Sequence, residues 1–460
     1  MALNTKTDRI PAQISSHDTE CAFLWDESFL WGLMAYDALI ATNLSFELIS
    51  SEDIRNDALD NYSLLFVPGG WASNKLKTLG DRGIEKIRKF VKAGGNYLGF
   101  CGGAGLATMD GIGLLPIVRR HTKERVPSFS GRIRLIPSDH PIWRNIAEPI
   151  FHAWWPSQFV LTGETVEILA TYGDALPDSF SSDLNVGDVE TAGEWATLEK
   201  RYQINLNPRR LHDEPAIVEG TAGKGKVVLS LVHFDTPDDA NGSMILQNLW
   251  RYLTHHRNKS SIWRNRTQYD DKEKFPKPPF APFSPGGYGQ DDNLVLISGM
   301  ATAVRGLILL GERNFLWFWR NPFLLQWRRG VRGLEYCTLF VMVNQIMEIV
   351  GQLSDNSYMR SQSDQSLSTA DRGIVNLGSN LRKISKLLFP FVKKAERLLL
   401  LERFAMQHEH ITYEKCDEPE IQKIRSELFS SSKSHGGLFK RLIDEVDATL
   451  FALIRQKAID

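Results

Sequence analysis

A single cysteine stands where a predicted buried strand, Asn96–Phe100, turns into a predicted helix over Gly102–Ala107. Gly99-Phe100-Cys101-Gly102-Gly103 has the G-x-C-x-G form of a nucleophile elbow, in which glycines permit the strained turn that exposes the nucleophile. A following helix N-terminus favours the thiolate form of cysteine. The amide of Gly102 could also donate to a developing oxyanion. The alternative is a small buried cysteine that serves tight packing.

A glycine-rich loop follows the preceding predicted strand, Ser63–Val67. It reads Pro68-Gly69-Gly70-Trp71. Neighbouring parallel strands end at the same edge of a sheet, so this loop should open beside Cys101. The amides of Gly69 and Gly70 could supply a second oxyanion donor. A plain turn between a strand and a helix is the alternative.

A histidine and a carboxylate follow a later predicted strand, Val227–Leu231. They are His233 and Asp235. A cysteine nucleophile needs an imidazole nearby to accept its proton and later to protonate the leaving group. We expect His233 to fill this role and Asp235 to orient its ring. A histidine at the end of a strand can also be purely structural.

Three further side chains could border a pocket over the cysteine. Asp26 ends the first predicted strand, Trp71 closes the glycine-rich loop, and Trp154 belongs to a dense aromatic cluster, His152-Ala153-Trp154-Trp155. Trp154 could stack on a planar ligand or could pack in the core. No histidine, cysteine or carboxylate spacing matches a metal site, so we expect no metal and no cofactor.

The elements that position these residues alternate between buried strands and helices as far as residue 255. Predicted strands cover Cys21–Trp25, Phe46–Ile49, Ile133–Ile136, Val166–Tyr172 and Ala216–Glu219; predicted helices cover Leu30–Thr42, Ile84–Ala93 and Gly242–Leu253. This alternation predicts an α/β domain with a flavodoxin-like parallel sheet that carries helices on both faces. The expected organisation is a tail at 1–17, this domain at 18–255, a Pro-rich linker at 256–292 and an all-α domain at 293–460.

The last part of the chain has helical periodicity throughout. Leu294–Leu310 and Leu334–Ile349 are apolar on most sides and should lie inside a bundle, and 354–370 should form a loop. Aromatic and arginine residues mix at Phe315–Arg320 and Gln326–Arg329. We interpret them as a bundle helix with an arginine-rich rim, rather than a membrane-interface helix or an RNA-binding patch.

Composition limits the possible functions. The chain has 460 residues and a net charge of −1, which gives no electrostatic reason to bind nucleic acid. Its four cysteines form no CxxC motif, which is typical of a reducing compartment. The polar N-terminus shows no secretory signal, and the longest apolar stretch, Leu294–Leu310, contains Arg305. We expect a cytoplasmic protein that does not bind membranes.

The motifs together resemble the class I glutamine amidotransferase-like superfamily, and within it most closely the biotin-protein ligase N-terminal domain family. The resemblance covers about residues 18–255. It rests on CAFLWD at 21–26, FVPGGW at 66–71, GNYLGFCGGAGLA at 95–107 and HFDTPDDANGSMILQNLW at 233–250. Amidotransferases typically carry His-x-Glu, where this chain has Asp235. After Asp292 the sequence shows no biotinyl-adenylate motif of the GRGRxG type and no P-loop.

These observations predict a cysteine-dependent attack on an amide or related acyl carbon of a small molecule. Cys101 would attack, His233 would transfer the proton, and the amides of Gly70 and Gly102 would hold the oxyanion. The alternative is a non-catalytic ligand-sensing or scaffold module whose helical half binds a partner protein. The missing ammonia acceptor favours this alternative, and the elbow cysteine favours catalysis.

Overall fold

The computed structural model describes residues 20–254, 292–361, 370–407, 416–430 and 434–459. The expected tail at 1–17 lies outside these residues, and so does nearly all of the expected linker at 256–292. The domain boundaries therefore remain predictions.

Five parallel strands build the part of the sheet that carries the elbow. Their order is β2-β1-β3-β4-β13, and their bounds are β1 Cys21–Leu24, β2 Glu47–Ile49, β3 Leu64–Val67, β4 Asn96–Phe100 and β13 Gly225–Ser230. Most of their residues are buried, as expected for a parallel sheet covered on both faces. The continuous apolar runs of the sequence correctly predicted these strands.

The sheet continues beyond β13 with antiparallel strands, which corrects the expectation of a parallel sheet. The added strands are β12 Pro215–Ala222, β9 Glu167–Ala175, β6 Phe129–Pro137, β10 Phe180–Ser181 and β11 Leu184–Asn185, with β7 Ile150–Trp154 paired to β6. Only two residues join β12 to β13, and a connection this short permits only an antiparallel pair. A separate small sheet pairs β5 (Ile117–Arg119) with β8 (Phe159–Leu161).

The described part of the α/β half has seven α-helices, and four of them overlap predicted helices. The seven are α1 Leu30–Ala41, α2 Ser51–Arg55, α3 Ala72–Ala93, α4 Gly102–Ala107, α5 Val186–Ala192, α6 Trp195–Tyr202 and α7 Ala240–Leu253. Helix α3 begins twelve residues before the predicted start. A kink at Gly80, where φ is 60°, separates this additional first part from the predicted helix. Glycine adopts this backbone conformation without steric cost.

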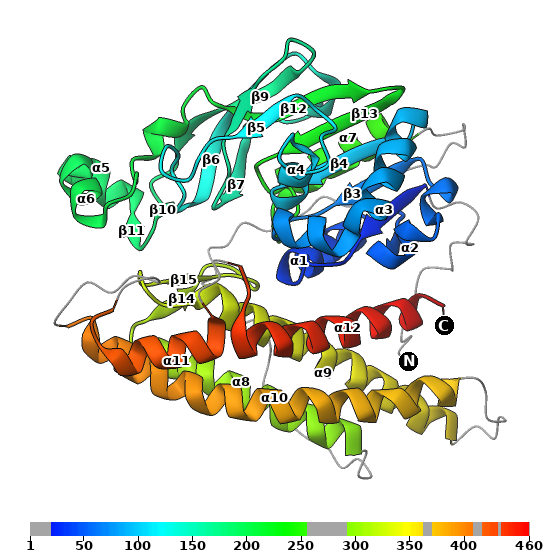
Figure 1. The fold of residues 1–460 in the computed structure, drawn as a ribbon, viewed down its shortest axis with the longest axis vertical. Helices are drawn as coiled ribbons and strands as arrows, with labels where there is room; N and C mark the ends of the chain where they lie inside the picture. Colours follow the sequence, from blue (N-terminus) through cyan, green and yellow to red (C-terminus); the bar gives the residue numbers. More distant parts are fainter. Residues whose placement is uncertain (1–19, 255–291, 362–369, 408–415, 431–433, 460) are drawn as a thin grey trace, which may run out of the picture.

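The C-terminal half consists of helices and one hairpin. The elements are α8 Asp292–Arg313, β14 Trp317–Trp319, β15 Leu325–Trp327, α9 Gly333–Ser361, α10 Ala370–Ala405, α11 Pro419–Phe429 and α12 Gly437–Ile459. The fold class, α/β followed by a helical region, is thus confirmed. In Figure 1 the helices lie below the α/β half, and the hairpin β14–β15 lies between them.

Three expectations for this half were wrong. The aromatic and arginine residues around 315–329 form the hairpin instead of a helix, and Asn321 accepts backbone hydrogen bonds in its turn. Helix α9 continues to Ser361, into the segment expected to be a loop. Helix α8 buries one face only, and Val295 on its other face is exposed.

Two helices are long and apolar enough to cross a membrane by length and composition alone. They are Asp292–Arg313 and Gly333–Ser354, and the structure buries 44% and 61% of their most apolar windows. Helices α8 and α9 pack against each other and contribute Val304, Leu307, Val343 and Ile346 to the core. Core helices of non-membrane proteins pass the same test, so it is weak evidence for a span.

Candidate functional site

Cys101 occupies a strained turn between β4 and α4. Its backbone has φ 47° and ψ −102°, outside the regions that non-glycine residues prefer. Its N–H donates a 2.8 Å hydrogen bond to the carbonyl of Ser230 on β13, which fixes the corner to the neighbouring strand. Cys101 is partly exposed, whereas the other three cysteines are buried. The strained backbone and this exposure are those of a nucleophile elbow.

Glycines let three backbone segments meet around this turn. A Cβ added to Gly102 would lie 2.0 Å from the Gly70 carbonyl oxygen, and one added to Gly70 would lie 2.3 Å from the Glu27 carbonyl oxygen. Gly70 also has φ +117°, a conformation that L-residues rarely adopt. The elbow, the loop after β3 and the loop after β1 are therefore in direct backbone contact.

The parallel pairing of β4 with β13 brings His233 to the cysteine. Ser230 is in register with Phe100, so the residues just beyond both strands share one edge. His233 is fully buried, and its Nδ1 is 2.9 Å from Oδ1 of Asp235. A donated Nδ1–H leaves Nε2 to face the thiol. Nε2 forms no hydrogen bond with any other described residue.

The electrostatics of His233 depend on its two neighbours. Burial lowers the pKa of His233, but the Asp235 carboxylate and the Cys101 thiol raise it above its usual value. An imidazole stabilised in its charged form beside a thiol can hold that thiol as a thiolate. Asp235 Oδ2 is buried without a partner among the described residues, so His233 is its main contact.

The glycine-rich loop lies against the histidine ring. A Cβ on Gly69 would be 3.1 Å from His233 Cε1 and 2.9 Å from Trp31 Cβ. The Trp31 ring covers His233 with a centroid distance of 4.9 Å. Gly69, Gly70 and Gly102 thus surround the elbow, where an oxyanion hole would have to form.

The three expected pocket residues lie in different environments. The Asp26 carboxylate accepts a hydrogen bond from the Ser51 backbone at the start of α2. Trp154 is 2% exposed, and its Nε1 donates a 3.1 Å hydrogen bond to Thr236 Oγ1, as a core residue would. Trp71 is partly exposed, and its ring centroid is 6.3 Å from that of His435 in the C-terminal half.

Lys75 is a site residue that the sequence interpretation missed. It is completely buried in α3, and its Nζ donates to the Asp26 carbonyl at 2.9 Å and to Ser28 Oγ. Burial lowers its pKa to about 8, against the opposing effect of nearby carboxylates, and Cys101 is among the groups that act on it. Nothing in the sequence distinguishes Lys75 from a surface lysine of an amphipathic helix.

The C-terminal half borders the same edge of the sheet. Lys440 of α12 forms a 2.9 Å ion pair with Glu27, and the His435 ring lies 5.1 Å from that of Phe29. Trp327 of β15 stacks on Trp155 at 5.0 Å, and Trp155 in turn contacts Trp31 at 6.1 Å. Aromatic contacts therefore connect the hairpin to the candidate catalytic histidine.

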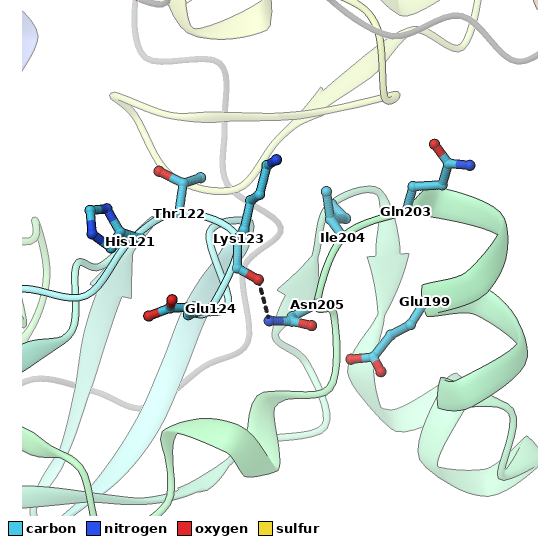
Figure 2. Close-up of a pocket in the computed structure, with 8 residues that line it drawn as sticks. All are labelled: His121, Thr122, Lys123, Glu124, Glu199, Gln203, Ile204 and Asn205. Carbon is cyan, nitrogen blue, oxygen red and sulfur yellow. Dashed lines mark hydrogen bonds between the residues drawn. The ribbon is translucent and has the colours of Figure 1, made fainter.

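The structure also has a separate polar pocket. Figure 2 shows it between the 121–124 segment and the end of α6, lined by His121, Thr122, Lys123, Glu124, Glu199, Gln203, Ile204 and Asn205. Asn205 Nδ2 donates 3.2 Å hydrogen bonds to the carbonyls of Lys123 and Arg125. Cys101 and His233 do not line this pocket.

Comparison with known proteins supports the expected resemblance. The family model described as "Biotin-protein ligase, N terminal" matches residues 27–110, which include the glycine-rich loop and Cys101. The resemblance is confirmed over these residues. The search of the curated proteins found no match.

Solved structures with similar folds align with about half of the chain. PurLQS from Thermotoga maritima is 16% identical over 51% of this chain and 99% of its own, with a TM-score of 0.35. A glutamine amidotransferase is 19% identical over 51% of this chain and 97% of its own, with a TM-score of 0.32. A β-galactosidase from Bacillus circulans sp. alkalophilus is 16% identical over 51% of this chain and 31% of its own, with a TM-score of 0.33. Identities this low do not indicate a shared activity.

Proposed function

We propose that this chain, whose residues 27–110 resemble the biotin-protein ligase N-terminal domain, is a cysteine-dependent amidohydrolase or acyltransferase. The observation that carries the proposal is the juxtaposition of a partly exposed, strained Cys101 with a buried His233–Asp235 pair. A structural cysteine would need neither the positive φ nor a paired histidine beside it. The expected ligand is a small-molecule amide or related acyl compound.

The reaction proceeds in two displacement steps. The Cys101 thiolate attacks the acyl carbon and forms a C–S bond, and the carbonyl electrons move onto oxygen, where the amides of Gly70 and Gly102 hold the charge. When the electrons return, the C–N bond breaks, and the His233 imidazolium gives its proton to the leaving amine. Water, deprotonated by His233, then attacks the thioester, so that the acid is released and the thiol is restored.

The buried Asp235 has a positioning role. Its 2.9 Å contact with Nδ1 keeps Nε2 directed toward the sulfur and stabilises the charged ring. Aspartate takes the place of the usual glutamate here, and the short His-x-Asp spacing still makes the contact. No disulfide joins any of the four cysteines in the described residues, which supports a reducing, cytoplasmic location.

Selective alkylation tests the proposal. The full chain is treated with iodoacetamide at neutral pH, and mass spectrometry follows each cysteine over time. Cys101 should react at least about tenfold faster than the others, because thiolate and exposure control the rate. Burial raises the pKa of Cys337 to about 12 and raises that of Cys21 further. Cys101→Ser supplies the control. Equal rates, or a protected Cys101, would reject the catalytic reading.

The second candidate is a non-catalytic scaffold whose helical half binds a protein. Three apolar side chains on α10 favour it: Phe389, Leu400 and Phe404 are 44%, 51% and 61% exposed. Exposed apolar residues that share one helix can form a partner surface. An inert Cys101 together with a stable fold would favour this candidate.

A further inference from the structure

The loop after β1, residues 26–29, has a strained backbone. Glu27 and Phe29 have φ values of 55° and 48°, in the left-handed region that residues other than glycine rarely adopt. A backbone strained in this way persists only where the surrounding structure holds it in place. The contacts made by these four residues therefore determine the conformation of the loop.

Helix α3 supplies one set of these contacts. Lys75 Nζ donates to the Asp26 carbonyl at 2.9 Å and also to Ser28 Oγ. Asn74 Nδ2 donates to Glu27 Oε2 at 3.1 Å. Both donors lie near the start of α3, directly after the glycine-rich loop. The loop after β1 is thus bound to the segment that follows the glycines.

The helical half supplies the other set. Lys440 Nζ on α12 lies 2.9 Å from Glu27 Oε1, the carboxylate oxygen that Asn74 leaves free. The same ammonium lies 5.6 Å from the centroid of the Phe29 ring, and the His435 ring packs on Phe29 at 5.1 Å. The Lys440 and Glu27 side chains are only 27% and 13% exposed, so salt screens this ion pair less than a pair at the open surface.

The loop after β1 restricts Gly70 in turn. A Cβ added to Gly70 would lie 2.3 Å from the Glu27 carbonyl oxygen and 3.2 Å from Ser28 Cα, and one added to Gly102 would lie 2.0 Å from the Gly70 carbonyl oxygen. Glycine has an intrinsically mobile backbone, so the packed Glu27 carbonyl is what fixes the peptide groups of Gly70. Displacement of the loop would allow the Gly70 amide to turn.

We propose that Lys440 is a positioning residue for the candidate site. Through Glu27 it keeps the loop after β1 against Gly70, so that the amides of Gly70 and Gly102 stay directed at the oxyanion position. The helical half thereby controls acyl transfer without touching the reacting atoms. That these amides hold an oxyanion rests on the proposed function, whereas the contacts that lead from Lys440 to Gly70 do not.

Hydrogen exchange of the full chain, followed by mass spectrometry, tests the hold on the loop. The amides of residues 28 and 31–33 report on it, because they donate to the carbonyls of Trp25, Ser28 and Phe29. Lys440→Met removes the ammonium and keeps a long side chain. It should raise exchange at 28–33 by about tenfold, since a hydrogen bond to a charged group is lost, and leave exchange in α7 unchanged.

Three variants control this measurement. Lys440→Arg should keep exchange slow, because a guanidinium group also binds a carboxylate. Lys394→Met removes an ion pair with Glu427 inside the helical half and should not alter exchange at 28–33. Glu27→Gln should raise exchange less in the Lys440→Met background than in the wild type, because the contact is already lost there. Unchanged exchange at 28–33 in Lys440→Met, or an equal rise in α7, would overturn the proposal.

Two reactions of Cys101 test the link to the oxyanion amides. Acylation by p-nitrophenyl acetate forms a C–S bond, places charge on the carbonyl oxygen and then releases nitrophenolate. Alkylation by iodoacetamide forms a C–S bond and releases iodide without any oxyanion. Lys440→Met should slow acylation by at least about tenfold, because an oxyanion donor is displaced, and should change alkylation little. Equal effects on both reactions would overturn the role assigned to Gly70.

Failure of the proposed function would give a different result. If Cys101 of the wild type resists both reagents, catalysis is rejected. The exchange data still decide whether Lys440 holds the loop, because they do not depend on the thiol.

Discussion

The indole Nε1 of Trp25 donates a 2.9 Å hydrogen bond to Oδ1 of Asp447. This bond joins the end of the first strand to the last helix, 422 residues away in sequence. The Trp25 ring also stacks on Phe451 at 6.1 Å. The C-terminal half therefore contacts the α/β half beside the candidate site. Substitutions in α12 should change the surroundings of that site.

Replacing Asp447 by asparagine should stabilise the protein at neutral pH. Burial and the nearby carboxylates, Asp26 first among them, raise the pKa of Asp447 well above its usual value. A raised carboxyl pKa means that stability is lost as pH rises, because ionisation is harder in the folded state. Asparagine keeps the acceptor for Trp25 without the charge, so the free energy of unfolding at pH 7 should rise by roughly 1–3 kcal/mol.

Urea denaturation at pH 7 and pH 4 checks the Asp447 prediction. The gain should shrink at the lower pH, where the wild-type carboxyl also becomes protonated in the unfolded chain. Asp447→Ala removes the acceptor as well and is the control that should destabilise. A gain of equal size at both pH values would show that charge is not its cause.

His435 should make the wild type sensitive to acid. Burial, followed by the charges of Lys440 and Arg332, lowers the pKa of His435 to about 3. The unfolded chain therefore binds more protons at this position between about pH 3 and 6.5, and stability falls as pH drops through that range. The free energy of unfolding falls by at most about 1.4 kcal/mol for each pH unit because of this one group.

His435→Phe should remove this part of the pH dependence. The ring packs against Phe29 and Phe439 at 5.1 and 4.9 Å, so phenylalanine fits the site. Melting temperatures of both proteins at pH 7 and pH 5 provide the comparison. The melting temperature of the variant minus that of the wild type should be larger at pH 5 than at pH 7. An equal difference at both pH values would contradict the prediction.

The sequence predicted the meeting of Cys101 with His233 better than it predicted the surroundings of these two residues. Cys101 and His233 follow continuous apolar strands, so pattern alone placed both at one sheet edge. The antiparallel half was missed, although the short Gly223–Lys224 connection marks a hairpin. Lys75 could not be identified, because burial is a tertiary property. The contact between Trp25 and Asp447 likewise has no local signal.

Gly102→Ala should disrupt the elbow. The added Cβ would lie 2.0 Å from the Gly70 carbonyl, so one backbone segment must move. Overpacking of this kind typically costs about 1–3 kcal/mol. Gly299→Ala in α8 is the matched control: no atom lies within 4 Å of its added Cβ, and it should stabilise by about 0.5–1 kcal/mol. Thermal unfolding measures the change in stability of both variants. Equal changes in melting temperature would contradict the close backbone contact.

The pH dependence of Cys101 alkylation should depend on His233. The imidazole, charged through its 2.9 Å contact with Asp235, favours the thiolate beside it. Loss of an opposite charge at close range reduces the charged form by roughly tenfold or more. His233→Ala should therefore slow alkylation at neutral pH by about that factor and shift the pH–rate profile to higher pH. Circular dichroism would verify that the fold is retained.

The Asp235 variants separate charge from position. Asp235→Asn should slow alkylation less than His233→Ala, since the ring remains but loses its counter-charge. Asp235→Glu restores the His-x-Glu pattern of amidotransferases and should keep most of the rate if the longer side chain still reaches Nδ1. An unchanged pH–rate profile in His233→Ala would mean that the ring and the sulfur do not interact. Cys101 would then lack a base, and the scaffold function would become the better interpretation.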